Sequence, residues 1–165
     1  MNINCKEVIT LSEAEVDDAE AILVLQKIAY QDEAEIHDDF SIQLLLQTIE
    51  GTLDEFKSQL VLKAIKDDKI IGSIRAYDVD KTCYINKLIV DPGFQNRGIG
   101  SRLLKEIEGR FNDVLRYELF TGYMSERNIY FYKKYGYKEF SRIKKSDKLT
   151  LICFEKYLLN NGGEV

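Results

Sequence analysis

The middle of the chain limits the possible folds most strongly. Residues 60–91, LVLKAIKDDKIIGSIRAYDVDKTCYINKLIVD, are rich in β-branched and aromatic side chains and carry two short polar sites, Asp67-Asp68 and Asp80-Lys81. Apolar runs separated by two turn residues are typical of β-hairpins. The segment therefore predicts three consecutive antiparallel strands, which form a meander and not a βαβ unit.

Helical periodicity precedes these strands. The segment LSEAEVDDAEAILVLQKIAY (11–30) has Ser12 three residues before Glu15, which predicts a capping box at the start of a helix. The segment SIQLLLQTIEGTLDEF (41–56) carries six apolar residues on one helical stripe and predicts a second helix. The acidic stretch QDEAEIHDDF (31–40) is expected to link the two helices.

After the meander, helix and strand patterns alternate. The predicted elements are a helix over 99–111, a strand over 115–120, a short helix over 125–136 that ends at Gly136, and strands over 137–143 and 148–158. The order β-α-α-β-β-β-α-β-α-β-β predicts an α+β (mixed α/β) layer fold. We expect a single domain over residues 1–158 and a disordered tail over 159–165.

Composition excludes several classes of protein. The apolar runs are too short to span a bilayer and the start of the chain lacks a secretion signal, so a cytoplasmic protein without membrane contact is expected. Cys5, Cys83 and Cys153 lie far apart and His37 is the single histidine, which argues for reduced thiols and against a metal site. The 23 basic residues are scattered, so nucleic acid is not an expected partner.

The stretch GFQNRGIGSRLL (93–104) places Gly93, Gly98 and Gly100 where a helix should begin. A helix start presents unpaired backbone N–H groups and the positive end of the helix dipole. Glycines at such a start let the backbone wrap a bulky anion without a Cβ in the way. The stretch therefore predicts a phosphate or pyrophosphate site.

Two familiar nucleotide motifs do not fit this stretch. Gly93 and Gly98 have the spacing of a P-loop, but Ile99 and Gly100 replace its Lys and Ser/Thr. Gly98 and Gly100 begin a dinucleotide fingerprint, but Leu103 stands where the third glycine belongs, and the preceding strands form a meander. Neither ATP nor a dinucleotide is therefore the expected anion.

The run QNRGIG (95–100) resembles the (R/Q)-x-x-G-x-(G/A) signature of the GNAT superfamily of N-acetyltransferases. INKLIVDPGFQNRGIGSRLL (85–104) is similar to the central strand, Pro-containing turn and pyrophosphate helix of that family, and NIYFYKKYGY (128–137) to its second motif. The order of elements agrees from residue 1 to about 158. The resemblance implies a central, mostly antiparallel sheet of six to seven strands with helices on both faces.

The resemblance also implies acetyl-CoA as cosubstrate and a primary amine that attacks its thioester directly. Backbone N–H groups from Gln95 through Ser101 would hold the pyrophosphate, and the strand around Leu88 would pair with the pantetheine arm after splaying from YELFT (117–121). Asn128 would hydrogen-bond the cofactor and Phe131 would pack against it. The implied cofactor-binding residues are Leu88, Ile89, Val90, Gln95, Asn96, Arg97, Gly98, Ile99, Gly100, Ser101, Asn128 and Phe131.

The same resemblance places Tyr132 at the position of the general acid. A phenol with an ordinary pKa of about 10 is protonated at neutral pH and can give its proton to the leaving thiolate. The general base is not assigned, because Asn86 stands where many relatives have Glu. Candidates for the base are Glu118 on the facing strand and Glu33, Glu35 and His37 in the acidic stretch.

The acidic stretch is expected to line the acceptor side, where it would select a cationic small molecule. Residues 1–60 hold fourteen of the 28 acidic residues and three of the 23 basic ones. An acidic loop that only keeps the chain soluble is an equal alternative. The expected substrate-binding residues are Tyr30, Glu33, Glu35, Asn86 and Glu118, with Phe40 as a further wall.

Other functions stay open at this point. The same scaffold can acetylate a protein N-terminus or lysine, and the missing Glu at Asn86 supports a non-catalytic acyl-CoA-binding module. The resemblance also allows a homodimer, in which the final strand TLICFEKYL (150–158) pairs across the interface.

Overall fold

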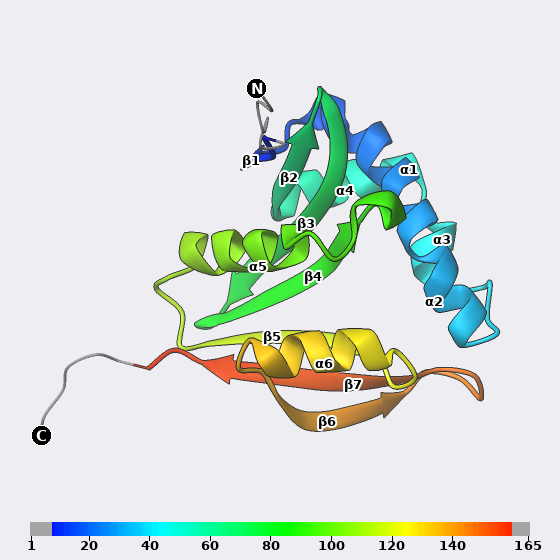
Figure 1. The fold of residues 1–165 in the computed structure, drawn as a ribbon. Coiled ribbons are helices and arrows are strands. Elements are labelled where there is room, and N and C mark those ends of the chain that lie inside the picture. The colour runs from blue at the N-terminus through cyan, green and yellow to red at the C-terminus, as the bar shows by residue number, and fades with distance from the viewer. Residues whose placement is uncertain (1–7, 160–165) are drawn as a thin grey trace, which may run out of the picture.

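The computed structural model describes residues 8–159, which form one seven-stranded sheet in the order β1-β2-β3-β4-β5-β7-β6 (Figure 1). The strands are β1 (Thr10–Glu13), β2 (Leu60–Lys66), β3 (Lys69–Val79), β4 (Thr82–Val90), β5 (Arg116–Gly122), β6 (Lys138–Lys144) and β7 (Thr150–Tyr157). The helices are α1 (Ala19–Ala29), α2 (Gln31–Ile36), α3 (Gln43–Leu46), α4 (Ile49–Ser58), α5 (Ile99–Arg110) and α6 (Glu126–Lys134), with 3-10 turns η1 (Val16–Asp18) and η2 (Pro92–Phe94). The predicted α+β class is confirmed. The predicted tail lies, from residue 160 on, outside the described residues.

The predicted meander is present. Strands β2, β3 and β4 pair antiparallel in chain order. In the two turns Asp67 and Asp68 have φ values of 48° and 60°, and Asp80 and Lys81 have values of 49° and 65°. Both central residues of each turn are therefore left-handed, which is the conformation that matches the twist of a tight hairpin.

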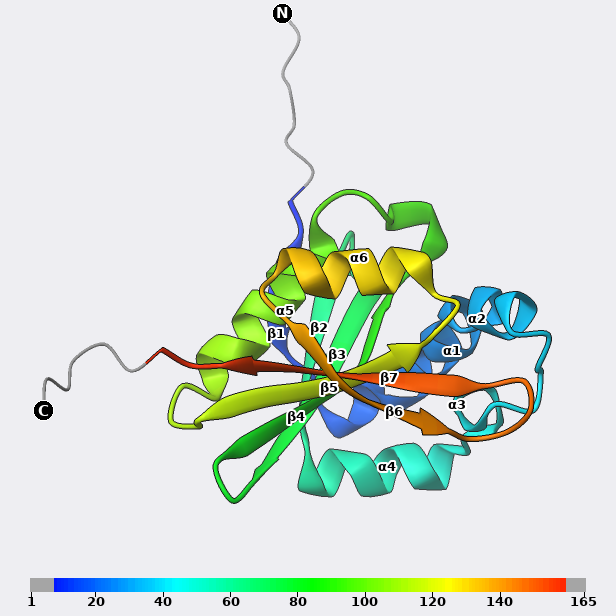
Figure 2. The same ribbon diagram turned by 90° about the horizontal axis from the view of Figure 1, so that it is seen from below.

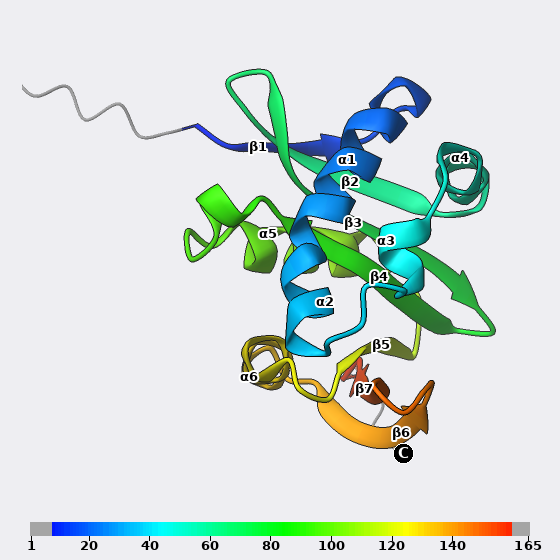
Figure 3. The ribbon, with the colours of Figure 1, turned by 90° about the vertical axis from the view of Figure 1, so that its right-hand side faces the viewer.

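Helices cover both faces of the sheet (Figures 2 and 3). Helix α5 packs on β2, β3 and β4 from one side, and α1 packs on β3 and β4 from the other. The buried stripe of α5 consists of Ile99, Leu103, Leu104 and Ile107. Within residues 8–159 every helix is too short or too polar to cross a bilayer.

The predicted capping box at Ser12 is wrong by one turn. Ser12 belongs to β1 and pairs with Lys63 of β2, so its backbone serves the sheet and not a helix. The first helical turn starts after Glu15, whose N–H donates to Asp18 Oδ2 at 2.8 Å. The same capping arrangement is therefore made by Glu15 and Asp18.

The segment between α1 and the meander also differs from the prediction. The acidic stretch is not a plain link, because its residues Gln31–Ile36 form α2. The expected second helix is divided into α3 and α4. Thr48 interrupts it in an extended conformation, where its Oγ1 accepts the N–H of Gly51 at 3.1 Å. A threonine is a better N-cap than an interior helical residue, which explains the division.

The final strand does not offer a free edge. Strand β7 lies between β5 and β6 and pairs with both, whereas β1 and β6 are the edge strands of the described sheet. The expectation that the final strand pairs across a dimer interface is therefore wrong, since both of its edges are in use.

Strands β4 and β5 are the parallel neighbours of this sheet, and they separate soon after they meet. Pairing joins Thr82–Tyr84 to Arg116–Glu118 and goes no further. Beyond this point β4 runs away from β5, as Figure 1 shows. On its other edge β4 has a bulge: its register with β3 shifts between Ser73 and Arg75, and Lys87 opposite this shift has a left-handed φ of 51°.

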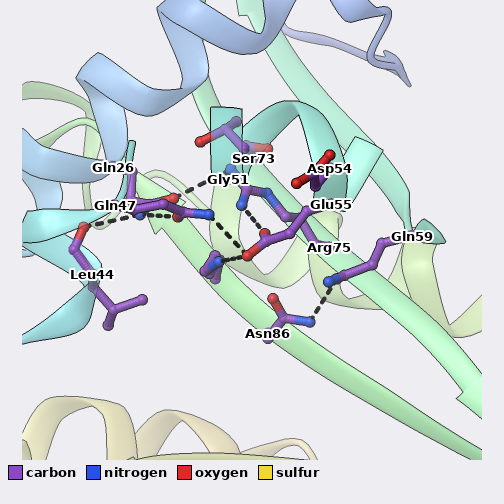
Figure 4. A network of polar contacts seen from close by, with 12 residues as sticks. Gln26, Leu44, Gln47, Gly51, Asp54, Glu55, Gln59, Ser73, Arg75 and Asn86 are labelled. Atoms are coloured by element: carbon purple, nitrogen blue, oxygen red, sulfur yellow. Dashed lines mark hydrogen bonds and ion pairs between the residues drawn. The ribbon is translucent and has the colours of Figure 1, made fainter. Parts of the chain in front are cut away.

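A buried polar network supports the bulge from the α1 and α4 side (Figure 4). The Arg75 side chain is 1% exposed and forms an ion pair with Glu55 of α4 through Nη1. Its Nη2 donates to Gln26 Oε1 of α1 at 3.2 Å. Lys87 forms a second ion pair with Glu55, which ties the bulged residue of β4 to α4. Glu55 of α4 therefore accepts from Arg75 of β3 and from Lys87 of β4, and it links both strands to the helix.

Replacing Glu55 should destabilise the protein. Glu55→Gln leaves Arg75 and Lys87 without their carboxylate, and loss of one partner of a buried ion pair costs about 3 kcal/mol. Urea unfolding at pH 7 measures this change in the free energy of unfolding. Asp54→Asn is the matched control, because the Asp54–Lys57 pair is exposed on the same helix, and we expect a change within about 0.5 kcal/mol.

The defect should also depend on pH. Burial alone would raise the pKa of Glu55, but the hydrogen bond from Lys87 and the charges of Lys87 and Arg75 outweigh it and hold that pKa below its ordinary value of 4.5. The carboxylate therefore contributes stability above pH 4.5 that is lost as the pH falls through the lower folded-state pKa. The difference in the free energy of unfolding between wild type and Glu55→Gln should become smaller over that acidic range. A difference that stays constant with pH would contradict this explanation.

Candidate functional site

The glycine stretch forms a tight turn between β4 and α5. Asp91 caps η2, where its Oδ1 accepts the N–H of Gly93 at 2.9 Å. Asn96 and Gly98 both have left-handed φ values, 62° and 79°. Gly98 is the N-cap of α5, whose first residue is Ile99. The turn therefore brings the start of α5 back beside the end of β4.

The first turn of α5 can receive an anion. The N–H groups that open a helix have no acceptor within it. Ser101 keeps its hydroxyl inside this turn by donating to the carbonyl oxygen of Gly98 at 3.0 Å. The turn contains no acidic residue. Since the dipole places partial positive charge here, the geometry is suited to phosphate oxygens.

Helix α6 lies close to this turn. A Cβ added to Gly100 would stand 3.7 Å from the Phe131 ring and 3.8 Å from Val90 Cγ2, so Gly100 keeps the gap between these side chains narrow. On the solvent side, Arg127 of α6 donates to the amide oxygen of Gln95. The predicted cofactor residues of the glycine stretch and of α6 are thus neighbours in space.

Basic side chains surround the same turn. Lys66 and Lys69 lie over the Phe94 ring, with Nζ 5.1 and 6.0 Å from its centroid, and the Arg97 guanidinium lies 5.2 Å from it. These cations come from the β2–β3 turn and from the glycine stretch. Lys69 also forms an ion pair with Asp91 at 3.3 Å, and the basic residues still outnumber this carboxylate, so the local charge adds to the helix dipole in favouring an anion at this end of the site.

The second half of β4 runs from this turn along the separation from β5. Leu88 and Val90 are half-buried there and pack against the core cluster that includes the apolar stripe of α5, and Ile89 is buried. A strand edge without a strand partner presents N–H and C=O groups that another extended chain can pair with. In the described residues, β5 supplies no partner to Leu88–Val90.

Tyr132 is buried on α6, next to the Phe131 ring that lies beside Gly100. It is 9% exposed, and its ring packs against Phe131, Tyr137 and Phe154 with centroid distances of 5.3, 5.9 and 6.2 Å. Burial, with the negative charge of Glu33 in addition, raises the pKa of Tyr132 well above its ordinary value. The phenol therefore keeps its proton at neutral pH.

Glu33 of α2 reaches the start of α6. Its Oε1 accepts a hydrogen bond from Asn128 Nδ2 at 3.2 Å, and its Oε2 accepts one from the Ser125 hydroxyl. His37 Nδ1 lies 3.7 Å from Oε2. Asn128 Nδ2 also donates to Thr121 Oγ1 of β5 at 3.2 Å. A carboxylate from the acidic stretch is thus joined to the motif residue Asn128.

Tyr30 belongs to the same cluster. It lies between α1 and α2, and burial is the main cause that raises the pKa of its hydroxyl far above the ordinary value. The neighbouring Tyr132 and the charge of Glu33 add to this shift. The structure therefore brings together four residues that the sequence predicted for three roles. These are Tyr30 and Glu33 for the substrate, Asn128 for the cofactor and Tyr132 for the general acid.

Three other predicted acceptor-side residues lie apart from this cluster. Glu35 is exposed on α2. Asn86 donates to Gln59 Oε1 at 2.9 Å, on the side of α4. Glu118 lies beside Tyr84, where β4 and β5 are still paired, and forms an ion pair with Arg116.

Sequence reasoning missed two residues that shape the cluster. Ser125 occupies the N-cap position of α6, but its side chain makes no cap and donates to Glu33. Gly122 ends β5, and a Cβ there would stand 2.4 Å from the imidazole of His37. The position of Gly122 at a strand end gave no signal, because the contact joins segments 85 residues apart. No group of three or more His, Cys, Asp or Glu within residues 8–159 is arranged to hold a metal ion.

Comparison with known proteins decides the family. A family model described as the acetyltransferase (GNAT) domain matches residues 57–139, which is half of the chain and includes β4, the glycine turn and α6. The chain belongs to the GNAT acetyltransferases. No curated protein matches this GNAT chain.

Solved structures share the fold of this GNAT protein. The PaiA N-acetyltransferase of Thermoplasma acidophilum, in complex with coenzyme A, is 19% identical with a TM-score of 0.77, over 92% of this chain and 99% of that one. YncA of Salmonella typhimurium, a putative acetyltransferase with acetyl-CoA, is 15% identical with a TM-score of 0.74, over 96% and 98%. The ribosomal-protein-S18-alanine N-acetyltransferase of Escherichia coli is 16% identical with a TM-score of 0.72, over 96% and 99%.

The left-handed N-cap of this GNAT site should be sensitive to a side chain. Gly98→Ala should lower the free energy of unfolding by about 1 kcal/mol, because a Cβ is strained at the φ of 79°. Gly109→Ala is the control in the same helix, because Gly109 has open space around it, and we expect it to stabilise by about 0.4–1 kcal/mol. Urea unfolding of both variants measures the two effects, and equal signs would contradict the assigned turn geometry.

Proposed function

We propose that this protein is an acetyl-CoA-dependent N-acetyltransferase that moves an acetyl group to a primary amine of a cationic small molecule. One observation carries the proposal. The buried, protonated Tyr132 packs on Phe131, and Phe131 lies against the anion-receiving start of α5 at Gly100, next to the end of the β4 stretch that has no β5 partner.

Several features support acetyl-CoA as the cosubstrate. Structural neighbours bind coenzyme A and acetyl-CoA, and the start of α5 offers N–H groups suited to a pyrophosphate. The pantetheine amides would pair with Leu88–Val90, the stretch of β4 without a β5 partner. Asn128 keeps its amide N–H on Glu33 and would offer its amide oxygen to the cofactor, and Phe131 would pack against the cofactor beside Gly100.

Tyr132 would act as the general acid. The amine nitrogen forms a bond to the thioester carbon, and the bond from that carbon to sulfur breaks as the carbonyl re-forms. The leaving thiolate then takes the proton of the Tyr132 hydroxyl. Burial keeps the phenol protonated at neutral pH, so its O–H is available to hydrogen-bond the sulfur and to deliver a proton as the carbon–sulfur bond breaks.

The acceptor side favours a cation. Glu33 faces the cluster, while Asp32, Glu35 and Asp38 are exposed on and after α2. Asp38 is held to the β6–β7 turn, because its carbonyl oxygen accepts Lys148 Nζ at 2.8 Å. The acidic stretch therefore spans from α6 to the β6–β7 turn, and a cation approaching from this side meets negative charge. The buried thiols Cys83 and Cys153 suit the cytoplasmic location that we expect.

Turnover tests this proposal directly. The release of free thiol from acetyl-CoA is followed with spermidine, kanamycin and a lysine-containing peptide as acceptors. Tyr132→Phe should lower kcat about 100-fold and leave the acetyl-CoA Kd within about twofold, because it removes a proton and keeps the ring. Tyr130→Phe on the exposed side of α6 is the control and should be unchanged.

The outcomes separate the alternatives. Turnover with the peptide alone would replace the small-molecule acceptor by a protein. Acetyl-CoA binding without turnover of any amine would identify a non-catalytic binding module, and an unchanged Tyr132→Phe would remove the assigned acid.

A further inference from the structure

We infer that Glu33 is the base that takes a proton from the acceptor amine, and that Ser125 and His37 are its positioning residues. The inference rests on the proposed function, because it assigns a role within that reaction. Residue 86 of this chain is an asparagine, and an amide cannot take the proton of an amine, so the base is another group.

Position distinguishes Glu33 from the other acids of its segment. Helix α2 lies beside the start of α6 and the end of β5 (Figure 3). Glu33 is 20% exposed, whereas its neighbours Asp32 and Glu35 are exposed to solvent. Its charge also contributes to the raised pKa values of both Tyr30 and Tyr132. Of the three acids, Glu33 is thus the one that faces the proposed acid.

Ser125 holds the Glu33 carboxylate at a cost to its own helix. A serine at an N-cap normally accepts an N–H of the first helical turn. Ser125 is 2% exposed and makes no such cap, and its hydroxyl donates to Glu33 Oε2. Asn128 donates to the other oxygen. The two donors fix the plane of the carboxylate, and its exposed edge stays open to a substrate.

His37 fixes the backbone that carries Glu33. Its buried ring donates from Nδ1 to the carbonyl oxygen of Glu33 at 3.0 Å. On its far side the ring lies on Gly122, where a Cβ would come within 2.4 Å of Cε1 and Nε2. Nε2 is buried and has no hydrogen-bond partner among the described residues. The imidazole therefore fills the space between α2 and the end of β5 and contacts both.

The two acid–base groups account for every proton. The substrate ammonium gives one proton to Glu33 and becomes a free amine, whose lone pair forms the bond to the thioester carbon. When the bond to sulfur breaks, the thiolate takes the Tyr132 proton, and the tyrosinate recovers a proton from the nitrogen, which is positively charged after the attack and becomes the neutral amide nitrogen. Glu33 then releases its proton to solvent through its exposed edge. The products are an N-acetylated amine, the thiol of CoA and one proton.

The test compares Glu33 of α2, which contacts the start of α6, with Glu126, which belongs to the first turn of α6. Glu33→Gln keeps the shape of the side chain but cannot take a proton, and Glu126→Gln is the control because Glu126 is exposed in the first turn of α6. With the best amine from the panel above, Glu33→Gln should lower kcat at pH 7 about 100-fold. The acetyl-CoA Kd should change less than about twofold, and the control should keep the wild-type rate.

The pH profile separates a chemical role from a structural one. As the pH rises toward the amine pKa of about 10, more free amine is available and the defect of Glu33→Gln should shrink toward about tenfold or less. The other titratable or charged groups that influence this cluster are Tyr30, His37, Tyr132 and Arg75, and all are unchanged in this variant. A defect of constant size at every pH would overturn the inference.

Positioning is tested with Ser125→Ala and Gly122→Ala. Each should lower kcat about tenfold and leave the acetyl-CoA Kd unchanged, because Glu33 remains present but is no longer held. If the wild type acetylates the amine and Glu33→Gln does so at the same rate, this inference is overturned and the proposed function stands. Absence of turnover in the wild type would overturn both.

Discussion

The short parallel contact between β4 and β5 is the constraint on which the rest of the structure depends. The two strands pair from Thr82 to Tyr84 of β4 and then separate. Backbone groups along a separated edge need other partners, since unpaired buried N–H and C=O groups are costly. The structure places α6 on β5 at one side of this separation and the start of α5 at its end. An extended ligand with amides and a terminal phosphate group matches both requirements at once.

Ion pairs on the α1 and α4 side of the sheet stabilise the separation of β4 from β5. Lys87 has a left-handed conformation that is unfavourable for a side chain with a Cβ, and its ion pair with Glu55 ties it to α4. Arg75 shares that carboxylate from β3. A buried cation without its partner would be strongly unfavourable, so the network fixes the bulge. The bulge precedes Leu88–Val90 in β4, so this network also shapes the cofactor side of the site.

Local sequence patterns determine most of the fold, whereas contacts between distant segments determine most of the candidate site. The meander and the helix end at Gly136 follow from turn chemistry within a few residues, and the sequence predicted them. The sequence named Tyr132 and Asn128 through a motif, but it left Glu33 among four candidates. The deciding contact joins Glu33 to Asn128 across 95 positions, and no periodicity reports such a pairing. The helix break at Thr48 was missed because its apolar neighbours keep a helical spacing.

Hydrogen–deuterium exchange of the whole protein, with and without CoA, tests the central claim most directly. If the separation of β4 and β5 is the cofactor site, CoA should slow exchange at the amides of Leu88–Val90 and of Gln95–Ser101, and should leave the paired stretch Thr82–Tyr84 unchanged. Protection at neither segment, or protection confined to other strands, would contradict the assignment of this separation as the place where the reaction occurs.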